Sequence, residues 1–257
     1  MVGNLVKCSV LIVILLQGLP VLAAQKDTFT VARVIDGDTC VLENEERVRY
    51  LGINAPEQGD PYFNEATQAN SDLVARKEVR LEPQDPARDT QGRLLAYVFM
   101  NDVFVNEELL RQGCAHIQRP LVAKYRDRLL KAQKAAWQEA LGIWARAVER
   151  NVAIVEIHPD AEGNDRENLC DEYIVIENTG NIPVDLTGWT VSDEANHRYL
   201  FPSFVLKAKA AVTLRTGVGR NTESEIFWGS RGPIWNNDGD TIFMRDTEGE
   251  LALSLIY

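Results

Sequence analysis

Residues 49–57, with the sequence RYLGINAPE, bring several groups that could act on a phosphate into one short segment. The segment begins with Arg49, includes the amide side chain of Asn54 and the backbone carbonyl of Ala55, and ends with the carboxylate of Glu57. Surface charge is the ordinary explanation for such a composition. However, Asn-Ala-Pro-Glu at the end of a strand, just beyond an arginine, is hard to justify by stability alone. We therefore treat this segment as a candidate site.

Two turns elsewhere in the first half carry groups of the same kinds. In the sequence IDGDT, Gly37 permits a tight turn, and Asp38 then enters a strand with a carboxylate that can point into a cleft. Taken alone, Asp-Gly favours a structural hairpin turn. The second turn, DTQG, leads to Arg93 at the start of the apolar stretch LLAYV.

One set of these groups suits a hard cation. Calcium binds oxygen ligands, and the candidates are the Asp38 carboxylate, the Asn54 side-chain oxygen and the Ala55 carbonyl, completed by waters. A zinc site has no support, because the chain has no Cys-x-x-Cys pair and its histidines are scattered.

The other set suits a phosphate and a water molecule. The guanidinium groups of Arg49 and Arg93 could hold a phosphate and neutralise the charge that develops on it in a transition state. Glu57 could accept a proton from the attacking water or position that water. Each part is common by itself, but the ordered combination predicts phosphodiester hydrolysis.

Hydrophobic periodicity predicts the elements that must position these groups. Alternating residues indicate a small antiparallel meander followed by further strands, and apolar residues at helical spacing indicate three helices. The expected strands cover residues 28–34, 39–42, 47–53, 79–81 and 93–100, and the expected helices cover 63–77, 105–112 and 121–140. Gly113 and Gly142 are expected to end the last two helices. This arrangement predicts an α+β domain.

The helix at 121–140 has an apolar stripe and a basic surface. The stripe is expected to pack in the core rather than bind a cofactor, and it comprises Tyr125, Leu129, Ala132, Ala136, Trp137 and Ala140. The cations on or near the helix are Arg119, Lys124, Arg126, Arg128, Lys131 and Lys134. A solvated helix face is the plainer interpretation of these cations, and a face for nucleic acid is the alternative.

Length and charge divide the chain into two domains. Its 257 residues are enough for two cores, and its net charge of −11 argues against a simple polycationic coat for nucleic acid. Residues 25–150 hold 18 Lys+Arg and 20 Asp+Glu, a net of −2, whereas residues 151–257 hold 8 and 18, a net of −10. Short alternating strands replace helical periodicity in the second half. We expect domains at 25–150 and 151–257.

The first 24 residues read as a signal peptide, with Lys7, a short apolar run and small residues suited to cleavage. An uncleaved membrane anchor is the alternative. Cleavage predicts a secreted or periplasmic protein without a stable membrane span, which we expect to be a monomer. It would leave Cys40, Cys114 and Cys170, an odd number. We expect Cys40 and Cys114 to be small core residues, with a disulfide between them as the alternative.

The first half resembles the staphylococcal nuclease (thermonuclease) family from about residue 28 to 145. The similarity rests on the segments DGDT at 36–39, APE at 55–57 behind Arg49, GRLLAY at 92–97, VNEELLRQG at 105–113 and GIW at 142–144. The resemblance implies a five-stranded OB-type barrel with three helices, calcium-dependent endonucleolytic cleavage of DNA and RNA, and products with 3′-phosphate ends. Arg49, Glu57 and Arg93 match the family's catalytic residues, and Asp38 matches a calcium-binding aspartate.

The sequence departs from the family pattern in two places, at residues 54–55 and at residues 90–91. Asn54 stands where the resemblance implies a second calcium-binding aspartate, so metal binding is expected to be weaker. Ala55 stands where a threonine offers its carbonyl, which any residue can supply. Thr90 and Gln91 replace a lysine and a substrate-contacting tyrosine, which is expected to reduce base stacking.

The second half resembles the lamin-tail domain, an immunoglobulin-like β-sandwich. The segments that carry the similarity are EYIVIENTG at 172–180, VDLTGWTVSD at 184–193 and WNNDGDTI at 235–242. Trp189 alternates with Leu186 and Val191 as a sandwich core requires. The binding partner of this domain does not follow from the motifs. Calcium binding is conceivable at three aspartates, although turn-forming roles are favoured for all of them: Asp193, Asp238 and Asp240.

Two hypotheses follow from the sequence. The first is an exported calcium-dependent nuclease that acts on DNA and RNA, with the β-sandwich aiding attachment, substrate retention or stability. The second is a catalytically weakened or inactive module that binds nucleic acid and has lost its metal through Asn54. The presence of Arg49, Glu57 and Arg93 together favours the enzyme.

Overall fold

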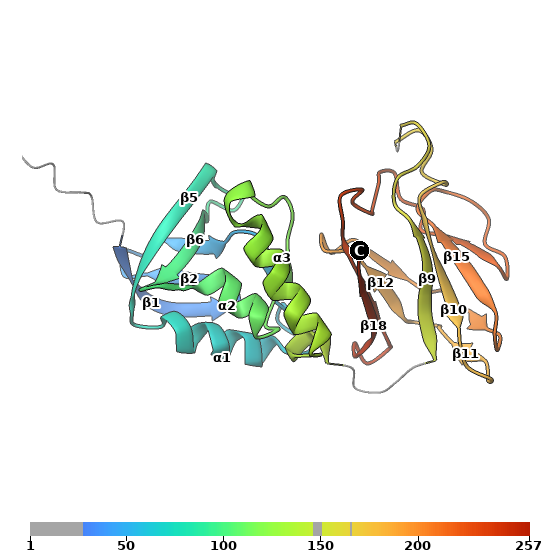
Figure 1. The fold of residues 1–257 in the computed structure, drawn as a ribbon, viewed down its shortest axis with the longest axis horizontal. Coiled ribbons are helices and arrows are strands. Elements are labelled where there is room, and N and C mark those ends of the chain that lie inside the picture. The colour runs from blue at the N-terminus through green and yellow to red at the C-terminus, as the bar shows by residue number, and fades with distance from the viewer. Residues whose placement is uncertain (1–27, 146–150, 165) are drawn as a thin grey trace, which may run out of the picture.

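The computed structural model describes residues 28–145, 151–164 and 166–257, which form two bodies side by side (Figure 1). The predicted signal peptide at 1–24 lies outside these residues. No helix within the described ranges is both long and apolar enough to cross a membrane.

The first body is a closed barrel of five strands. The barrel strands are β1 (Thr28–Asp36), β2 (Thr39–Leu42), β3 (Arg47–Tyr50), β5 (Glu78–Arg88) and β6 (Leu94–Met100). They lie in the order β3-β2-β1-β5-β6, and a parallel pairing of β3 with β6 closes the ring. β7 (Val103–Phe104) extends the sheet beyond β6. The barrel and its helices confirm the predicted OB-type fold.

Three helices pack around the barrel: α1 (Phe63–Val74), α2 (Val105–Arg111) and α3 (Ala123–Gln138). The predicted helix at 121–140 is therefore shorter at both ends. Ala140 is exposed with a φ of 52°, so its assignment to the apolar stripe is wrong, whereas Tyr125, Leu129 and Ala136 are buried as expected.

Two glycines join the end of α2 to the short 3₁₀ helix η1 (Gly142–Trp144). Gly113 has a φ of 70° and follows the C-cap of α2, so it ends that helix as expected. Gly142 also has a left-handed φ, of 54°, but it begins η1. The helix-ending role predicted for Gly142 is wrong, because α3 ends at Gln138 and Ala140 takes the left-handed position after it. A Cβ on Gly142 would lie 2.1 Å from the Gly113 carbonyl oxygen. No other residue type fits this close approach, which is sealed by a hydrogen bond from the Ile143 amide to the Gly113 carbonyl.

A small sheet links the candidate segment to the rest of the first body. β4 (Ile53–Asn54) pairs antiparallel with β8 (His116–Ile117), which places Asn54 opposite His116. The continuous strand predicted at 47–53 is thus split into β3 and β4 by a turn in which Gly52 has a φ of 75°.

The second body is a β-sandwich of two four-stranded sheets and one two-stranded sheet. One sheet has the order β16-β15-β10-β9, the other β13-β12-β17-β18, and β11 pairs with β14. The strands are β9 (Val152–His158), β10 (Tyr173–Asn178), β11 (Val184–Asp185), β12 (Thr190–Ser192), β13 (Arg198–Leu200), β14 (Val205–Leu206), β15 (Ala211–Arg215), β16 (Glu225–Phe227), β17 (Thr241–Arg245) and β18 (Leu251–Ile256). Leu186, Trp189 and Val191 lie in the core, which confirms the predicted alternation.

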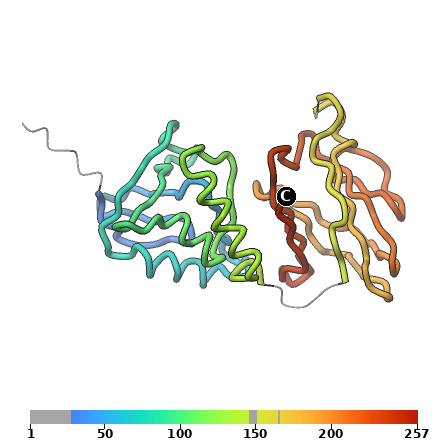
Figure 2. Tube along the Cα trace, viewed as in Figure 1, coloured from blue at the N-terminus to red at the C-terminus, as the bar shows by residue number. Residues whose placement is uncertain are grey.

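The two bodies share an apolar cluster. α3 and η1 face β17 and β18, and Figure 2 shows the C-terminal strand on the side of the sandwich that faces the barrel. The Trp144 and Phe243 rings stack at 5.3 Å, and the Trp137 indole donates to the Ser254 hydroxyl at 3.0 Å. A shared, buried apolar cluster of this kind resists separation of two domains, because opening it would expose both faces to water.

Ion pairs add to this interface. Arg119 lies 3.1 Å from the buried Glu194 carboxylate and 3.8 Å from that of Asp238, which Arg126 also approaches at 3.1 Å. Lys124 pairs with Glu82, and Arg128 with Glu107. Four of the six predicted basic residues are therefore paired with carboxylates, two of them across the domain boundary. The acidic second domain docks on the basic side of the first.

Asp193 and Asp240, the other two aspartates considered for calcium, hold turns. Asp193 accepts the His197 amide at 2.7 Å, and Asp240 accepts the amides of Asn236 and Thr241. These contacts match the turn-forming roles favoured from the sequence. Cys40, Cys114 and Cys170 are free thiols, with Cys40 buried.

Candidate active site

Arg49 is the centre of the buried part of the site. Its four terminal N–H groups donate to protein acceptors, and its Nε forms an ion pair. Nε faces the Asp38 carboxylate at 3.1 Å. One terminal nitrogen donates to the carbonyls of Tyr50 and Ile53 at 2.7 Å each, and the other to the side-chain oxygens of Asn54 at 2.8 Å and Gln118 at 3.2 Å. The arginine predicted to hold phosphate therefore also ties β3 to β4.

Asp38 lies against the end of β4, next to Ala55. One of its carboxylate oxygens accepts the Ala55 amide at 2.6 Å, and the other accepts the Thr39 hydroxyl at 3.1 Å. Burial raises its pKa to about 7, because desolvation of the carboxylate outweighs the attraction of Arg49. The turn that delivers Asp38 is tight: a Cβ on Gly37 would lie 2.5 Å from the Ala55 Cβ. Glycine at this position thus lets the DGDT turn press against the candidate ligands.

His116 is a buried member of the site that sequence reasoning missed. Its Nε2 lies 3.3 Å from the Asn54 amide nitrogen, and its Nδ1 lies 2.8 Å from the Ile117 carbonyl oxygen. Burial lowers the pKa of the imidazole to about 4, so the ring is neutral near pH 7. Its Nδ1 then donates to the carbonyl and its Nε2 accepts the Asn54 amide. The two contacts of the Asn54 side chain therefore set its orientation, with the amide nitrogen toward His116 and the oxygen toward Arg49. In the sequence, only the alternation of apolar and polar residues in AHIQ at 115–118, after Gly113, could have indicated a short strand that places His116.

Glu57 and Arg93 form the exposed part of the site. Glu57 is exposed, and its backbone amide donates to the Asp60 carboxylate at 3.1 Å. Arg93 is partly exposed, and its Nε donates to the Asp89 carboxylate at 2.6 Å. Within the described part of the chain, Asp89 is the one side chain that pairs with the Arg93 guanidinium, so its terminal nitrogens stay open to a ligand. The neighbouring residue Leu94 pairs with Val48, one position before Arg49.

A small pocket of about 50 Å³ lies where the candidate segment meets the second domain. Asn54, Ala55 and Glu57 contribute to its wall from the barrel side, together with His116. The second domain contributes five residues: Ser192, Asn196, Arg198, Phe243 and Arg245. The structure thus brings three of the six predicted site residues into one pocket. Asp38 and Arg49 lie behind it through their bonds to Asn54 and Ala55, and Arg93 stands apart on its own turn.

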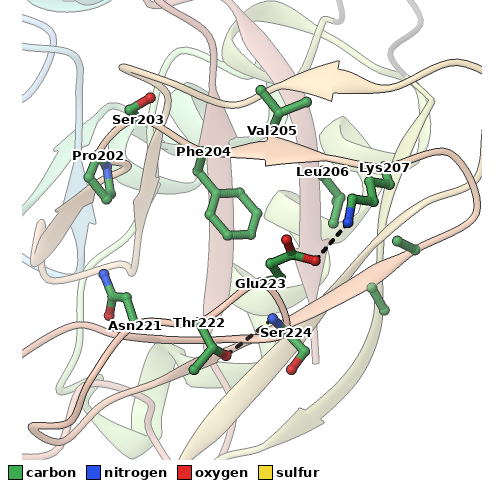
Figure 3. Close-up of a pocket in the computed structure, with 12 residues that line it drawn as sticks. Pro202, Ser203, Phe204, Val205, Leu206, Lys207, Asn221, Thr222, Glu223 and Ser224 are labelled. Atoms are coloured by element: carbon green, nitrogen blue, oxygen red, sulfur yellow. Dashed lines mark hydrogen bonds and ion pairs between the residues drawn. The ribbon is translucent and has the colours of Figure 1, made fainter.

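Another groove, of about 620 Å³, lies wholly on the second domain between residues 202–207 and 221–224 (Figure 3). Figure 3 shows Lys207 and Glu223 pointing toward each other across it, and their charged atoms lie 2.6 Å apart. None of the predicted catalytic or metal-binding residues lines this groove. The candidate active site is therefore the pocket at the domain boundary and the residues behind it.

The donor atoms near Asp38 are of the kind that calcium takes. The carboxylate, the Asn54 oxygen and residue Ala55 are drawn together by the Ala55–Asp38 and Arg49–Asn54 hydrogen bonds. A cation bound here would offset the burial of the Asp38 charge. The set is nevertheless poor in negative charge, since residues 28–145, 151–164 and 166–257 contain no cluster of three His, Cys, Asp or Glu side chains suited to a metal. The residues fit calcium by chemistry, with weak binding expected.

Comparison with known proteins gives the class of the barrel. A family model described as "Staphylococcal nuclease homologue" matches residues 47–146, and one described as "Lamin Tail Domain" matches residues 145–257. Thermonuclease from Staphylococcus intermedius is 35% identical over 130 residues, which cover 47% of this chain and 77% of the relative. Thermonuclease from Staphylococcus hyicus is 34% identical, over 48% of this chain and 78% of the relative. The SPbeta prophage-derived endonuclease YokF of Bacillus subtilis is 36% identical over 46% of this chain and 44% of the relative.

The barrel, the site and these similarities define a nuclease-type hydrolase fold. The chain belongs to the staphylococcal nuclease family, and its second half is a lamin tail domain.

Proposed function

We propose that the protein is an exported, calcium-dependent endonuclease that hydrolyses phosphodiester bonds of DNA and RNA and leaves 3′-phosphate ends. The observation that carries this proposal is the arrangement directly behind the pocket that Glu57 lines, where Arg49 forms an ion pair with Asp38 and a hydrogen bond to Asn54. Similarity to proteins named thermonuclease and endonuclease supports the reaction class.

The proposed roles divide between the exposed and the buried residues. Glu57, open to solvent, accepts a proton from a water molecule that attacks phosphorus. The open terminal nitrogens of Arg93 bind the phosphate oxygens as a fork. Arg49 contributes its positive charge from a fixed position, because its terminal N–H groups already have acceptors and its Nε is paired with Asp38. The bond from phosphorus to the 5′-oxygen then breaks. The leaving oxygen takes a proton from solvent to become a 5′-hydroxyl, and the phosphate stays on the 3′-oxygen.

Calcium, when bound, would supply positive charge to polarise the phosphate and stabilise the transition state. Asp38, Asn54 and the Ala55 carbonyl would hold it. Arg49 orients the Asn54 oxygen for this role, and the Ala55 amide orients the Asp38 carboxylate.

The proposed export rests on the sequence at 1–24, which carries the features of a cleavable signal peptide. We accordingly propose that the protein is secreted or periplasmic, and that it acts as a monomer on nucleic acid outside the cytoplasm.

A binding module without catalysis is the second candidate function. It is favoured by Asn54 in place of a carboxylate, since one carboxylate gives a divalent cation little charge to bind. It is opposed by Glu57, because an exposed carboxylate at the mouth of the pocket would repel a polyanion and help a binder in no evident way.

The test is cleavage of labelled single-stranded DNA, duplex DNA and RNA by the mature protein, titrated with calcium and then with EDTA. The proposal expects internal cuts that require calcium and products that kinase can label at the 5′ end without prior phosphatase treatment. Binding of all three substrates without cleavage at any calcium concentration would replace the enzyme with the binding module.

A further inference from the structure

The turn between β17 and β18 of the lamin tail domain lies against the loop that follows Glu57. We refer to residues 57–62 as the Glu57 loop. A Cβ on Gly249, in the β17–β18 turn, would lie 3.6 Å from the ring atoms of Pro61. Tyr62, at the end of the loop, packs on the apolar cluster that Phe243 and Leu251 share with the barrel domain. The second domain therefore covers one side of the Glu57 loop.

Arg245 brings a positive charge to the same place. It is the last residue of β17, half-buried, and lines the boundary pocket together with Glu57 and Asp60. Its guanidinium donates to the Gly249 carbonyl at 3.1 Å and lies over the Phe243 ring at 5.8 Å. Burial lowers the pKa of Arg245, and the Asp60 carboxylate opposes that shift. Arg245 and Asp60 thus line the same pocket from opposite sides of the domain boundary.

Asp60 connects this charge to Glu57. Its carboxylate accepts the Glu57 amide at 3.1 Å, and its own amide donates to the Glu57 carbonyl at 2.9 Å. Both side chains are exposed carboxylates three residues apart, so they repel each other when ionised. A cation beside Asp60 reduces that repulsion and holds the Asp60 carboxylate where it caps the Glu57 amide.

The charge is also unusual for its domain. Residues 151–257 hold only 8 Lys+Arg against 18 Asp+Glu, yet two of those cations, Arg198 and Arg245, line the pocket at the candidate active site. A domain that served only as a remote attachment would have no use for them there.

We propose that Arg245 of the lamin tail domain is a positioning residue of the nuclease site, which holds Asp60 and through it the Glu57 loop in the geometry used for catalysis. This inference rests on the proposed function, with Glu57 as the base. It makes the lamin tail domain part of the catalytic unit rather than an appendage.

The experiment compares full-length mature variants: Arg245→Ala, Arg245→Lys, Asp60→Asn and the double variant Arg245→Ala/Asp60→Asn. Arg231→Ala is the matched control, because it removes the same charge from an exposed position of the same domain that no described pocket at the boundary includes. Asp60→Asn keeps an acceptor for the Glu57 amide but removes the charge that Arg245 attracts.

Arg245→Ala is expected to lower kcat by about tenfold to a hundredfold, the effect of a misplaced catalytic group, with KM nearly unchanged. Arg245→Lys should retain most of the rate. Asp60→Asn should resemble Arg245→Ala, and the double variant should be no slower than either single one, because the two residues act as a unit. An Arg245→Ala variant with normal kcat, or additive losses in the double variant, would overturn the proposal.

A second readout separates this proposal from the proposed function. Hydrogen exchange of the peptide that contains the Glu57 loop needs no activity. The expected result is faster exchange of this peptide in Arg245→Ala and in Asp60→Asn. The exchange rate in Arg231→Ala should equal that of the natural protein. Faster exchange in a protein that cleaves nothing would reject the nuclease and keep the positioning contact. Unchanged exchange would reject the contact whether or not the protein cleaves.

Discussion

The buried and the exposed parts of the candidate site are built in different ways. Arg49 and Asp38 lie inside the barrel domain, where both are buried and paired with each other, which restricts their motion. Glu57 and Arg93 stand on exposed turns, each with one carboxylate neighbour from its own turn. The first part should therefore contribute mainly to stability, and the second mainly to reaction rate. Two arginines that look alike in the sequence receive different roles from their surroundings.

The largest expected effect is on the rate and falls on the exposed part. Glu57→Gln removes the proposed base but keeps the size of the side chain, so initial cleavage rates should fall by about a hundredfold to ten-thousandfold. The free energy of unfolding, measured with urea, should change by less than about 0.5 kcal/mol, because an exposed side chain is replaced. A variant that cleaves at the normal rate would remove Glu57 from the mechanism.

Substitution of Arg49 and of Arg93 should have different effects on the free energy of unfolding. Arg49→Ala leaves the buried Asp38 carboxylate without its partner, which typically costs about 3–5 kcal/mol. Arg93→Ala breaks a partly exposed pair with Asp89, which is worth at most about 1 kcal/mol, although cleavage should drop strongly. Equal stabilities for the two variants would show that the burial of Arg49 does not set its role.

The domain interface should show a pH dependence through Glu194. Burial raises its pKa from 4.5 to about 7 despite the nearby Arg119, so the folded state binds this proton more tightly than the unfolded state. The stability from Glu194 is complete below about pH 4.5 and is lost as pH rises through about 7. Relative to Glu194→Gln, the natural protein should thus lose about 1–3 kcal/mol over this range.

Urea unfolding at several pH values checks this, with Asp238→Asn as a control. Asp238 also pairs with Arg119 but is exposed, so Asp238→Asn controls for the loss of one carboxylate charge beside Arg119. Parallel stability curves for the natural protein and Glu194→Gln would contradict the expectation.

The smallest expected effect concerns the metal. Asn54→Asp adds a second carboxylate beside Asp38, and calcium should bind about tenfold more tightly because sites with more negative ligands bind it more strongly. Calorimetric titration measures this directly. His116 provides a check on the geometry, because an aspartate at 54 can no longer donate to its neutral Nε2. Unchanged calcium affinity would remove residue 54 from the ligand set.

Local patterns predicted the barrel elements better than their ends. The alternation around Gly37 and the helix-ending role of Gly113 depend on neighbouring residues, and both agree with the structure. The strand predicted at 79–81 continues to residue 88, because its backbone pairs with β6 even at Pro83, where local propensity opposes a strand.

Contacts between the domains could not be predicted from local sequence. Trp137 was expected on the core stripe of its helix, yet its indole bonds to Ser254, 117 positions away. The cations near α3 were expected to be solvated, and Arg119 instead meets Glu194. Such pairs depend on how two finished domains dock, and no periodicity of one segment records that. The buried role of His116 is hidden for the same reason, since it arises from the pairing of β4 with β8.

The most direct test of the account is the cleavage rate of a duplex DNA as a function of free calcium, measured in parallel for the natural protein and Glu57→Gln. The account predicts a rate that rises with calcium, falls to background in EDTA, and drops at least a hundredfold in Glu57→Gln at saturating calcium. Cleavage that ignores calcium, or equal rates for the two proteins, would contradict it.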